Sequence, residues 1–195
     1  MSPFSSNPFR LISLLNPETH KEMGEEHGSM GSIIVIMGSG SDLPFAERIR
    51  KFLVDEKIPV ECQFEVASAH RTPDVLLQRL ETYEESGRDI VYITVAGLSD
   101  ALSGVVAGCT KHPVIACPPD LEKFGWAKAF SSAMTPKGVP VLLATRPENA
   151  ALAAAKILAL TEKSLYKSIE KYMSRRRAET LKAGEALRKE PPGSQ

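Results

Sequence analysis

The sequence predicts an α/β protein in which a parallel sheet lies between two layers of helices. Short, continuously apolar segments are typical of strands buried on both faces. Each of these segments ends in turn-forming residues and is followed by a helical pattern, and the alternation recurs about five times. This alternation predicts a three-layer αβα sandwich, and right-handed crossovers make a flavodoxin-like strand order the simplest topology. An extra helix at the C-terminus completes the predicted fold.

The first strand–helix unit begins at residue 32. Residues 32–37 form a continuous apolar run, and the sequence Gly-Ser-Gly-Ser-Asp follows at 38–42. Pro44 suits the first turn of a helix, where its missing N–H group leaves no hydrogen bond unmade. Apolar residues then recur at helical spacing, namely Phe45, Ile49, Phe52 and Leu53. The pattern predicts an amphipathic helix that packs on the sheet.

The second unit repeats this arrangement. Residues 60–66 are expected to form a strand, and a helix is expected to start after them with Thr72 as its N-cap and Pro73 at its first position. Gly87 is a natural stop for this helix. The expected buried stripe consists of Val75, Leu76, Leu80 and Tyr83.

The third and fourth strands are expected at 90–96 and 113–117, which are almost wholly apolar. A turn at 97–100 and a short helix of small residues at 101–110 separate them. A Cys-Pro-Pro sequence ends the fourth strand and opens a loop that is expected to run to Gly125.

The remaining elements follow in the last third of the chain. They are a helix at 126–134, a turn at 136–138, a fifth strand at 140–145, a helix that starts at Pro147, and a final helix at 164–187. The final helix has one apolar stripe, made of Leu165, Ile169, Tyr172 and Met173. A helix added after a complete domain often packs on another chain, so this one suggests an oligomer.

Composition excludes several classes of protein. The 195 residues carry 24 Lys and Arg against 24 Asp and Glu, so the chain lacks the excess positive charge used in non-specific nucleic-acid binding. No apolar run approaches the roughly 20 residues that a membrane-spanning helix needs. Three scattered cysteines favour the reducing cytoplasm over a disulfide framework. The four histidines have no zinc-site spacing, so no metal is expected.

We expect three regions: an N-terminal extension at 1–30, an α/β domain at 31–162, and a C-terminal helix and tail at 163–195. The extension is interpreted either as a mobile segment or as an arm that docks on a neighbouring subunit. Four glutamates argue against organelle targeting, namely Glu18, Glu22, Glu25 and Glu26.

Ligands of such sheets bind beyond the carboxyl ends of the strands, so the loops there are the candidate site. In the loop 38–42, two glycines, two hydroxyls and the N–H groups of a helix N-terminus suit a phosphate. Asp42 could instead accept hydrogen bonds from ribose hydroxyls, or it could simply be the N-cap of the following helix. The sequence leaves these alternatives open.

The loop 67–72 carries the strongest chemical signal. Arg71 can hold a phosphate with two parallel hydrogen bonds, and the imidazole of His70 could move a proton. A solvated loop with a capping histidine is the alternative. The expected position of this loop opposite the loop 38–42 favours the functional interpretation.

Two further loops reach the same edge of the sheet. The small residues of 97–104 leave room for a ligand, although close packing of a short helix explains them equally well. Cys117 follows an apolar strand and is interpreted as a buried small residue rather than a nucleophile. His112 is expected to be structural, and the basic run 175–177 is expected to be a solvated helix face.

Six motifs occur in order between about residues 32 and 160: IMGSGSD, ASAHRTPD, VAGLSDALSGVVAG, HPVIACPP, SSAMTPKGVPV and NAALAAAKILAL. Together they resemble the phosphoribosylaminoimidazole carboxylase catalytic subunit family of purine biosynthesis. One class of this family adds CO2 directly to C4 of 5-aminoimidazole ribonucleotide (AIR). The other class, the mutases, moves a carboxyl group from N5 of N5-carboxyaminoimidazole ribonucleotide (N5-CAIR) to C4. The third motif and the Cys-Pro-Pro sequence are similar to the direct carboxylases.

The chain departs from the direct-carboxylase pattern at four positions. Arg71 stands where Lys is usual, and the resulting Ser-Ala-His-Arg sequence is the mutase form. Leu98 replaces an Arg and Asp100 replaces an Asn, so a positive charge is lost and a negative one is gained beside the site. Lys128 replaces an Asp, a change expected to affect packing between subunits.

The resemblance also implies a site and a mechanism. His70 would be the catalytic base that removes the C4 proton. The substrate would contact Ser39, Ser41, Asp42, Ser68, Ala69, Arg71, Gly97 and Ser99. In this assignment Ser68 and Arg71 hold the phosphate with help from Ser41, and Asp42 binds the ribose hydroxyls.

The expected partners are AIR and CO2, with no cofactor, nucleic acid or membrane, in a homo-octamer. The rival interpretations are an N5-CAIR mutase and a non-catalytic domain that binds a phosphoribosyl ligand.

Overall fold

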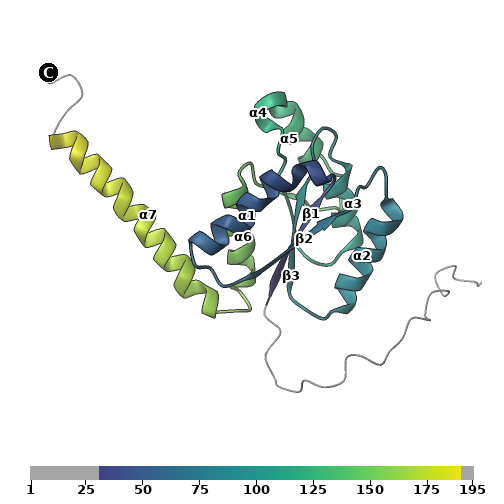
Figure 1. Ribbon diagram of the computed structural model, residues 1–195, viewed down its shortest axis with the longest axis horizontal. Helices are drawn as coiled ribbons and strands as arrows, with labels where there is room; N and C mark the ends of the chain where they lie inside the picture. Colours follow the sequence, from purple (N-terminus) through teal and green to yellow (C-terminus); the bar gives the residue numbers. More distant parts are fainter. Residues whose placement is uncertain (1–30, 190–195) are drawn as a thin grey trace, which may run out of the picture.

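The computed structural model describes residues 31–189, and their fold is the predicted one. Five parallel strands form one sheet in the order β2-β1-β3-β4-β5 (Figure 1). The strands are β1 (Ser32–Met37), β2 (Glu61–Val66), β3 (Ile90–Val95), β4 (Val114–Ala116) and β5 (Leu142–Leu143). The extension 1–30, with the roles considered for it, lies outside the described residues. The predicted domain boundaries stay a prediction.

Helices cover both faces of the sheet. After the 3-10 turn η1 (Gly40–Asp42), the helices are α1 (Leu43–Asp55), α2 (Pro73–Glu85), α3 (Ala101–Cys109), α4 (Leu121–Phe124), α5 (Trp126–Ala133), α6 (Pro147–Leu158) and α7 (Ser164–Lys189). The helices α1 and α6 pack on one face together with the start of α7, and α2 and α3 pack on the other. Figure 1 shows α4 and α5 at one end of the sandwich.

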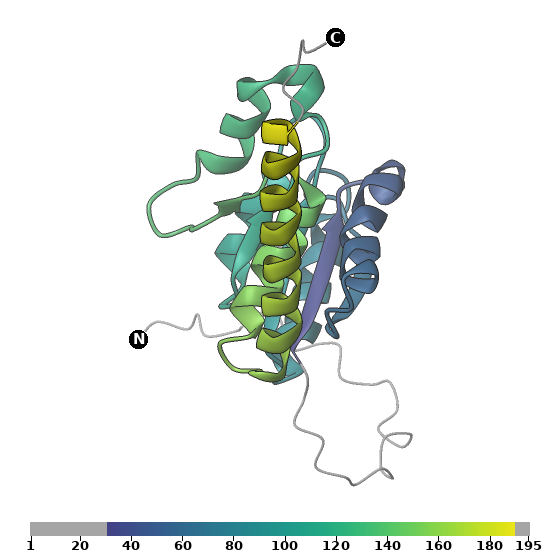
Figure 2. The ribbon, with the colours of Figure 1, turned by 90° about the vertical axis from the view of Figure 1, so that its left-hand side faces the viewer.

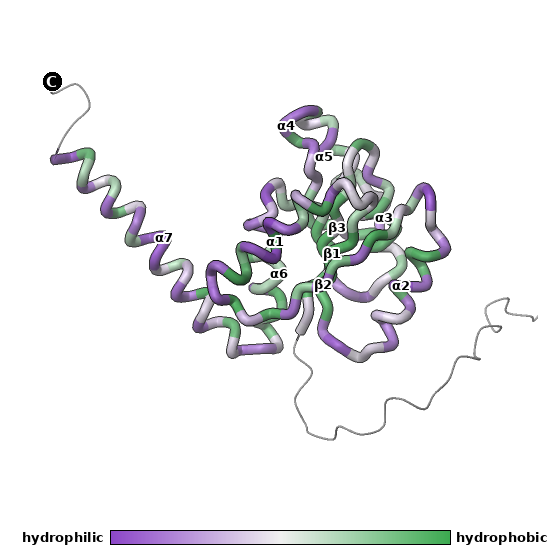
Figure 3. The backbone as a smooth tube through the Cα atoms, in the orientation of Figure 1, coloured by the Kyte–Doolittle hydropathy of each residue, from purple (hydrophilic) through white to green (hydrophobic). Residues whose placement is uncertain are grey.

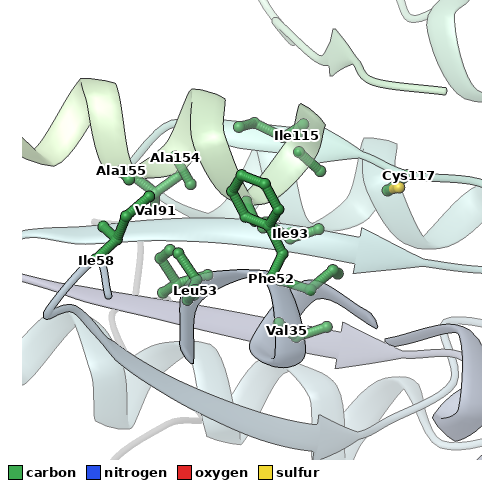
Figure 4. Packing of buried hydrophobic residues seen from close by; sticks show 14 of the residues in the cluster. Val35, Phe52, Leu53, Ile58, Val91, Ile93, Ile115, Cys117, Ala154 and Ala155 are labelled. Carbon is green, nitrogen blue, oxygen red and sulfur yellow. The ribbon is translucent and has the colours of Figure 1, made fainter. Parts of the chain in front are cut away.

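The apolar runs of the sequence become the central strands because helices bury both of their faces. Every residue of β1 and β3 is buried, and alternate side chains enter opposite layers. Ile33 and Val35 point toward α1 and α6, whereas Ile34 and Ile36 point toward α2 and α3. Figure 3 shows this core as a green centre within helices whose outer sides are purple. Figure 4 shows Phe52 of α1 near Val35 in the first layer.

The register of the sheet places the candidate loops side by side. Met37 at the end of β1 pairs with Val66 of β2 and with Val95 of β3. On the other side of β3, Thr94 pairs with Ala116 of β4. Because parallel strands that end in register release their chains at one edge, the loops that follow them meet there.

Two elements differ from their predictions. The expected fifth strand at 140–145 is only two residues long, and its side chains, Leu142 and Leu143, are exposed. Because β5 is an edge strand, only one of its sides is paired in the described chain. The expected loop after Cys117 contains the short helix α4 before Gly125, whose φ of 57° ends it.

The final helix is confirmed, but its buried stripe is shorter than predicted. Leu165 and Ile169 are buried, and Tyr172 packs edge-on against Phe52 with ring centroids 5.3 Å apart. Met173 is half exposed, so the prediction that it belongs to the stripe is wrong. Figure 1 shows the C-terminal half of α7 extending away from the sandwich, and in Figure 2, where that side faces the viewer, α7 lies in front of the sheet.

The basic run on α7 pairs with acidic residues, as expected of a solvated face. Arg175 contacts Glu56 at the end of α1, and Arg176 lies 2.5 Å from Glu179. His112 lies 3.6 Å from Glu84 at the opposite edge of the sheet from the candidate loops, which agrees with the structural interpretation. Within residues 31–189, no helix is long and apolar enough to cross a bilayer.

Candidate active site at the carboxyl edge of the sheet

The loops at the carboxyl edge enclose a cavity of about 700 Å³. All nine residues predicted for the site line it, namely Ser39, Ser41, Asp42, Ser68, Ala69, His70, Arg71, Gly97 and Ser99. The loops after β1, β2 and β3 therefore line one cavity together, although up to 60 residues separate them in the sequence. Phe45, Pro119 and Asp120 also line the cavity and were missed in the sequence, as do Leu98 and Leu102, whose loop was a candidate although they were not named as contacts.

The first loop is organised around Ser39 and Asp42. The Ser39 N–H group donates to Asp42 Oδ2 at 3.1 Å, and the Ser39 Oγ accepts from the Ser41 N–H group at 3.4 Å and from the Ser41 hydroxyl at 2.9 Å. These contacts form a capping box on the turn η1. Asp42 does occupy the N-cap position of α1, but its carboxylate makes no capping bond to that helix, because it accepts from the Ser39 N–H group instead.

The carboxyl group of Asp42 is less acidic than usual. Burial raises its pKa, and the nearby Asp120 carboxylate raises it further. The Ser39 N–H group, Lys128 and Arg71 act in the opposite direction. The pKa of Asp42 therefore reflects opposing influences, because two nearby cations lower it and a second carboxylate raises it.

The second loop closes on itself before α2 begins. Thr72 Oγ1 accepts from the Ser68 N–H group at 3.0 Å, and the Thr72 N–H group donates to the Ser68 carbonyl at 2.9 Å. Thr72 does occupy the N-cap position, but its hydroxyl makes no capping bond to α2, contrary to the prediction. The hydroxyl is used instead to hold the loop that carries His70 and Arg71.

Arg71 joins the second loop to the first. Its Nη2 donates to the Gly38 carbonyl at 2.8 Å, and its Nε lies 3.5 Å from Ser68 Oγ. His70 lines the same cavity with an exposed side chain, so a ligand in the cavity can reach it. The imidazole, the guanidinium and the Gly38–Asp42 turn therefore share one space.

The third loop is held from both sides at Leu98, a residue with a φ of 53°. The Leu98 N–H group donates to Asp120 Oδ2 at 3.0 Å, and the Leu98 carbonyl accepts from Lys128 Nζ at 2.7 Å. A Cβ atom on Gly97 would lie 2.8 Å from Asp120 Oδ2, so a larger residue there would displace the carboxylate that holds the Leu98 N–H group.

Asp100 supports the same loop from below. Its carboxylate accepts from the Ser103 N–H group at 3.0 Å and from the Ser103 hydroxyl at 2.7 Å, which makes it the N-cap of α3. Its N–H group donates to Ser131 Oγ at 2.8 Å. The negative charge at position 100 is therefore buried and used in capping rather than directed into the cavity.

Lys128 lies beneath this loop and is almost completely buried. Burial lowers the pKa of its ammonium group, while Asp100, Asp120 and Asp42 raise it. Cys117 is buried as expected, and burial raises the pKa of its thiol to about 12, which suits a packing role. Within residues 31–189, no group of three or more His, Cys, Asp or Glu side chains could hold a metal ion.

Comparison with known proteins gives a consistent result. The family model described as AIR carboxylase matches residues 32–179. A phosphoribosylaminoimidazole carboxylase of Archaeoglobus fulgidus is 43% identical over 155 residues, which are 80% of this chain and 84% of that protein. An N5-carboxyaminoimidazole ribonucleotide mutase of Methanocaldococcus jannaschii is 37% identical over 158 residues, which are 80% of this chain and 97% of that protein.

A solved structure agrees with the fold. The crystal structure of Treponema denticola PurE is 37% identical to the chain and matches it with a TM-score of 0.76. The match covers 80% of this chain and 98% of that one.

Proposed function

The chain belongs to the AIR carboxylase family, and from this premise we propose that it carboxylates AIR at C4 with CO2 in purine biosynthesis. The product is 4-carboxy-5-aminoimidazole ribonucleotide (CAIR). Relatives of the chain bear the names of both classes, so the direct reaction is the specific part of the proposal. The Ala-Gly-Leu-Ser-Asp-Ala-Leu-Ser-Gly segment and the Cys-Pro-Pro sequence, which resemble the direct carboxylases, support it.

One observation carries the proposal: His70 and Arg71 share a cavity with the Gly38–Asp42 turn. A sugar phosphate needs a cationic fork and N–H donors at one end, and proton transfer needs a titratable group near the reacting carbon. The cavity brings both kinds of group together, and its volume of about 700 Å³ falls in the usual range for small-molecule sites.

In this proposal the phosphate binds to Arg71 and Ser68, with the Ser41 hydroxyl assisting. Arg71 is already aligned by the Gly38 carbonyl, so little side-chain freedom is lost when the phosphate binds. Asp42 accepts hydrogen bonds from the ribose hydroxyls. The remaining predicted contacts, Ser39, Ala69, Gly97 and Ser99, surround the ring and sugar.

The chemistry follows from the substrate. The exocyclic amine of AIR pushes electron density onto C4, and the C4 electron pair forms a bond to the carbon of CO2. C4 then carries both a proton and the new carboxylate. His70 takes that proton, the C–H electrons restore the aromatic ring, and CAIR results. The protein supplies position, exclusion of water and a base.

The mutase is the second candidate because a specific residue favours it. Arg71 gives the loop the Ser-Ala-His-Arg sequence of the mutase class, and a mutase is 37% identical to the chain. Both reactions end with loss of the C4 proton, so the same role for His70 serves either one.

A substrate-choice assay tests the proposal. The purified protein is given AIR with bicarbonate in one vessel and N5-CAIR in another, and formation of CAIR is followed. We expect CAIR from AIR and bicarbonate. Consumption of N5-CAIR alone would assign the mutase reaction. Binding of AIR without turnover of either compound would assign a non-catalytic binding domain and overturn the enzyme proposal.

A further inference from the structure

Lys128 is a buried cation that the proposed chemistry has not used. It belongs to α5, and only 2% of its surface is exposed. Burying an ammonium group is costly unless hydrogen bonds and opposite charges compensate it. The Leu98 carbonyl supplies a hydrogen bond at 2.7 Å, and the charges of Asp100, Asp120 and Asp42 attract the ammonium group.

These contacts connect Lys128 to the cavity wall. Leu98, Asp42 and Asp120 all line the cavity, whereas Lys128 itself does not. Asp120 holds the N–H group of Leu98 and Lys128 holds its carbonyl, so the two side chains fix a residue whose positive φ is unfavourable for leucine. The Gly97–Ser99 backbone therefore depends on two separate hydrogen bonds, one to Asp120 and one to Lys128.

The charge of the wall gives Lys128 a second role. Asp42 and Asp120 contribute carboxylates to the lining, and Arg71 is the one Lys or Arg side chain among the lining residues described. If Arg71 binds the phosphate, the carboxylate at C4 of the product shares the rest of the cavity with two acidic residues. Repulsion between like charges would weaken binding of that product unless a nearby cation offset it.

We propose that Lys128 is a positioning residue that fixes the Gly97–Ser99 backbone and offsets Asp42 and Asp120, so that the cavity accepts the carboxylated nucleotide. The proposal rests on the proposed function, because it concerns the ligand of that same site. It distinguishes two ligands that differ by one carboxylate, AIR and CAIR. CAIR is a ligand in the direct reaction and in the mutase reaction alike.

The test is Lys128→Met, which removes the charge and retains most of the side-chain volume. Isothermal titration measures the Kd of AIR and of CAIR, and steady-state assays measure KM and kcat in both directions. We expect the Kd of CAIR to rise about tenfold or more, while the Kd of AIR changes much less. Lys156→Met, at an exposed lysine on α6, is the matched control and should leave both constants unchanged.

A second substitution separates charge from structure. In Lys128→Met, changing Asp120→Asn removes one of the opposing carboxylates and retains an oxygen that can accept from the Leu98 N–H group. We expect the double variant to recover much of the lost affinity for CAIR. A purely structural role would give no such recovery. Equal weakening of both ligands, or no recovery, overturns the proposal.

A single substitution of Asp120 tests the proposal if Lys128→Met fails to fold. Asp120→Asn in the otherwise unchanged chain should then strengthen CAIR relative to AIR, and an unchanged ratio of the two Kd values overturns the proposal. Failure of the proposed function is a separate result. It appears as absence of turnover by the unchanged protein, whereas the Lys128 proposal is decided by the ratio of binding constants.

Discussion

The proposed proton transfer depends on the side chain of His70. It lies in the cavity beside Arg71, and its side chain is exposed to a ligand there. For His70→Asn we expect kcat to fall by about 10²–10⁴, the usual contribution of a positioned general base. The KM for AIR should stay close to that of the unchanged protein, because Arg71 and Ser68 still bind the phosphate. Steady-state kinetics check both values, and normal turnover would remove His70 from the mechanism.

The raised pKa of Asp42 makes the stability of the protein depend on pH at a residue of the candidate site. A raised pKa means that the native state holds the proton more tightly than the unfolded chain does, so ionisation of Asp42 lowers stability as pH rises. We therefore expect Asp42→Asn to increase the melting temperature at pH 7 while weakening the binding of AIR. The increase should disappear as pH falls below about 4, where the carboxyl group of the unfolded chain is also protonated.

Thermal unfolding at several pH values measures this effect. An Asn side chain can still accept from the Ser39 N–H group, so the loop should persist in the variant. A melting temperature that falls at pH 7 would show that the ionised carboxylate stabilises the native loop, contrary to the expectation.

Site residues that directly follow a strand could be predicted from the sequence. Residues that reach the site from segments farther along the chain could not. All nine predicted residues lie directly after β1, β2 or β3, so the parallel sheet alone brings them together. Asp120 and Lys128 lie 22 and 30 residues after Leu98, and no local pattern connects them. The sequence did mark positions 98, 100 and 128 as departures, and the structure brings these three residues together around one loop.

At the scale of elements, the continuous apolar runs predicted the central strands well and the edge strand β5 poorly. The segment 140–145 has the same composition as an interior strand, but two residues pair with β4 and their side chains are exposed. Burial of a strand depends on what covers it, and composition does not record this. Helix α4 is only four residues long, which is too short to show a period in the sequence.

The packing of α7 provides a test at the same scale. Leu165 is fully buried against the layer formed by α1 and α6. Leu165→Ala should lower the free energy of unfolding by about 2–5 kcal/mol, because it removes buried methyl groups and leaves a cavity. Urea denaturation measures the change. Leu181→Ala, on the exposed part of the same helix, should change it by only about 0.5 kcal/mol. Equal effects would contradict the observed docking of α7.

At the scale of the whole molecule, large apolar side chains gather on α5 and the adjoining strand β5. Trp126 is 76% exposed and Met134 is 78% exposed, and Phe130 and Leu142 are also uncovered. Exposed apolar patches of this kind mark interaction surfaces. They support the proposal that this surface is an interface between copies of the chain, and the family resemblance implies that eight copies assemble.

Light scattering after size-exclusion chromatography tests the assembly. The unchanged protein should have eight times the mass of one 21.2 kDa chain. Trp126→Glu should shift the mass to smaller species, because a buried carboxylate at an interface is costly. Glu122→Gln, at an exposed acidic residue on α4, is the control and should leave the mass unchanged. A monomer in the unchanged protein would refute the octamer.

The matched ends of the central strands also limit how this chain can diverge. Met37, Val66 and Val95 stand level across the sheet, and a step along a strand is about 3.3 Å. Deleting one residue from β1 or β3 would pull a loop of the candidate site back by that step and would also exchange the two faces of the strand. Substitutions in the loops can therefore change the chemistry of the site during evolution, whereas selection should remove insertions and deletions within these strands.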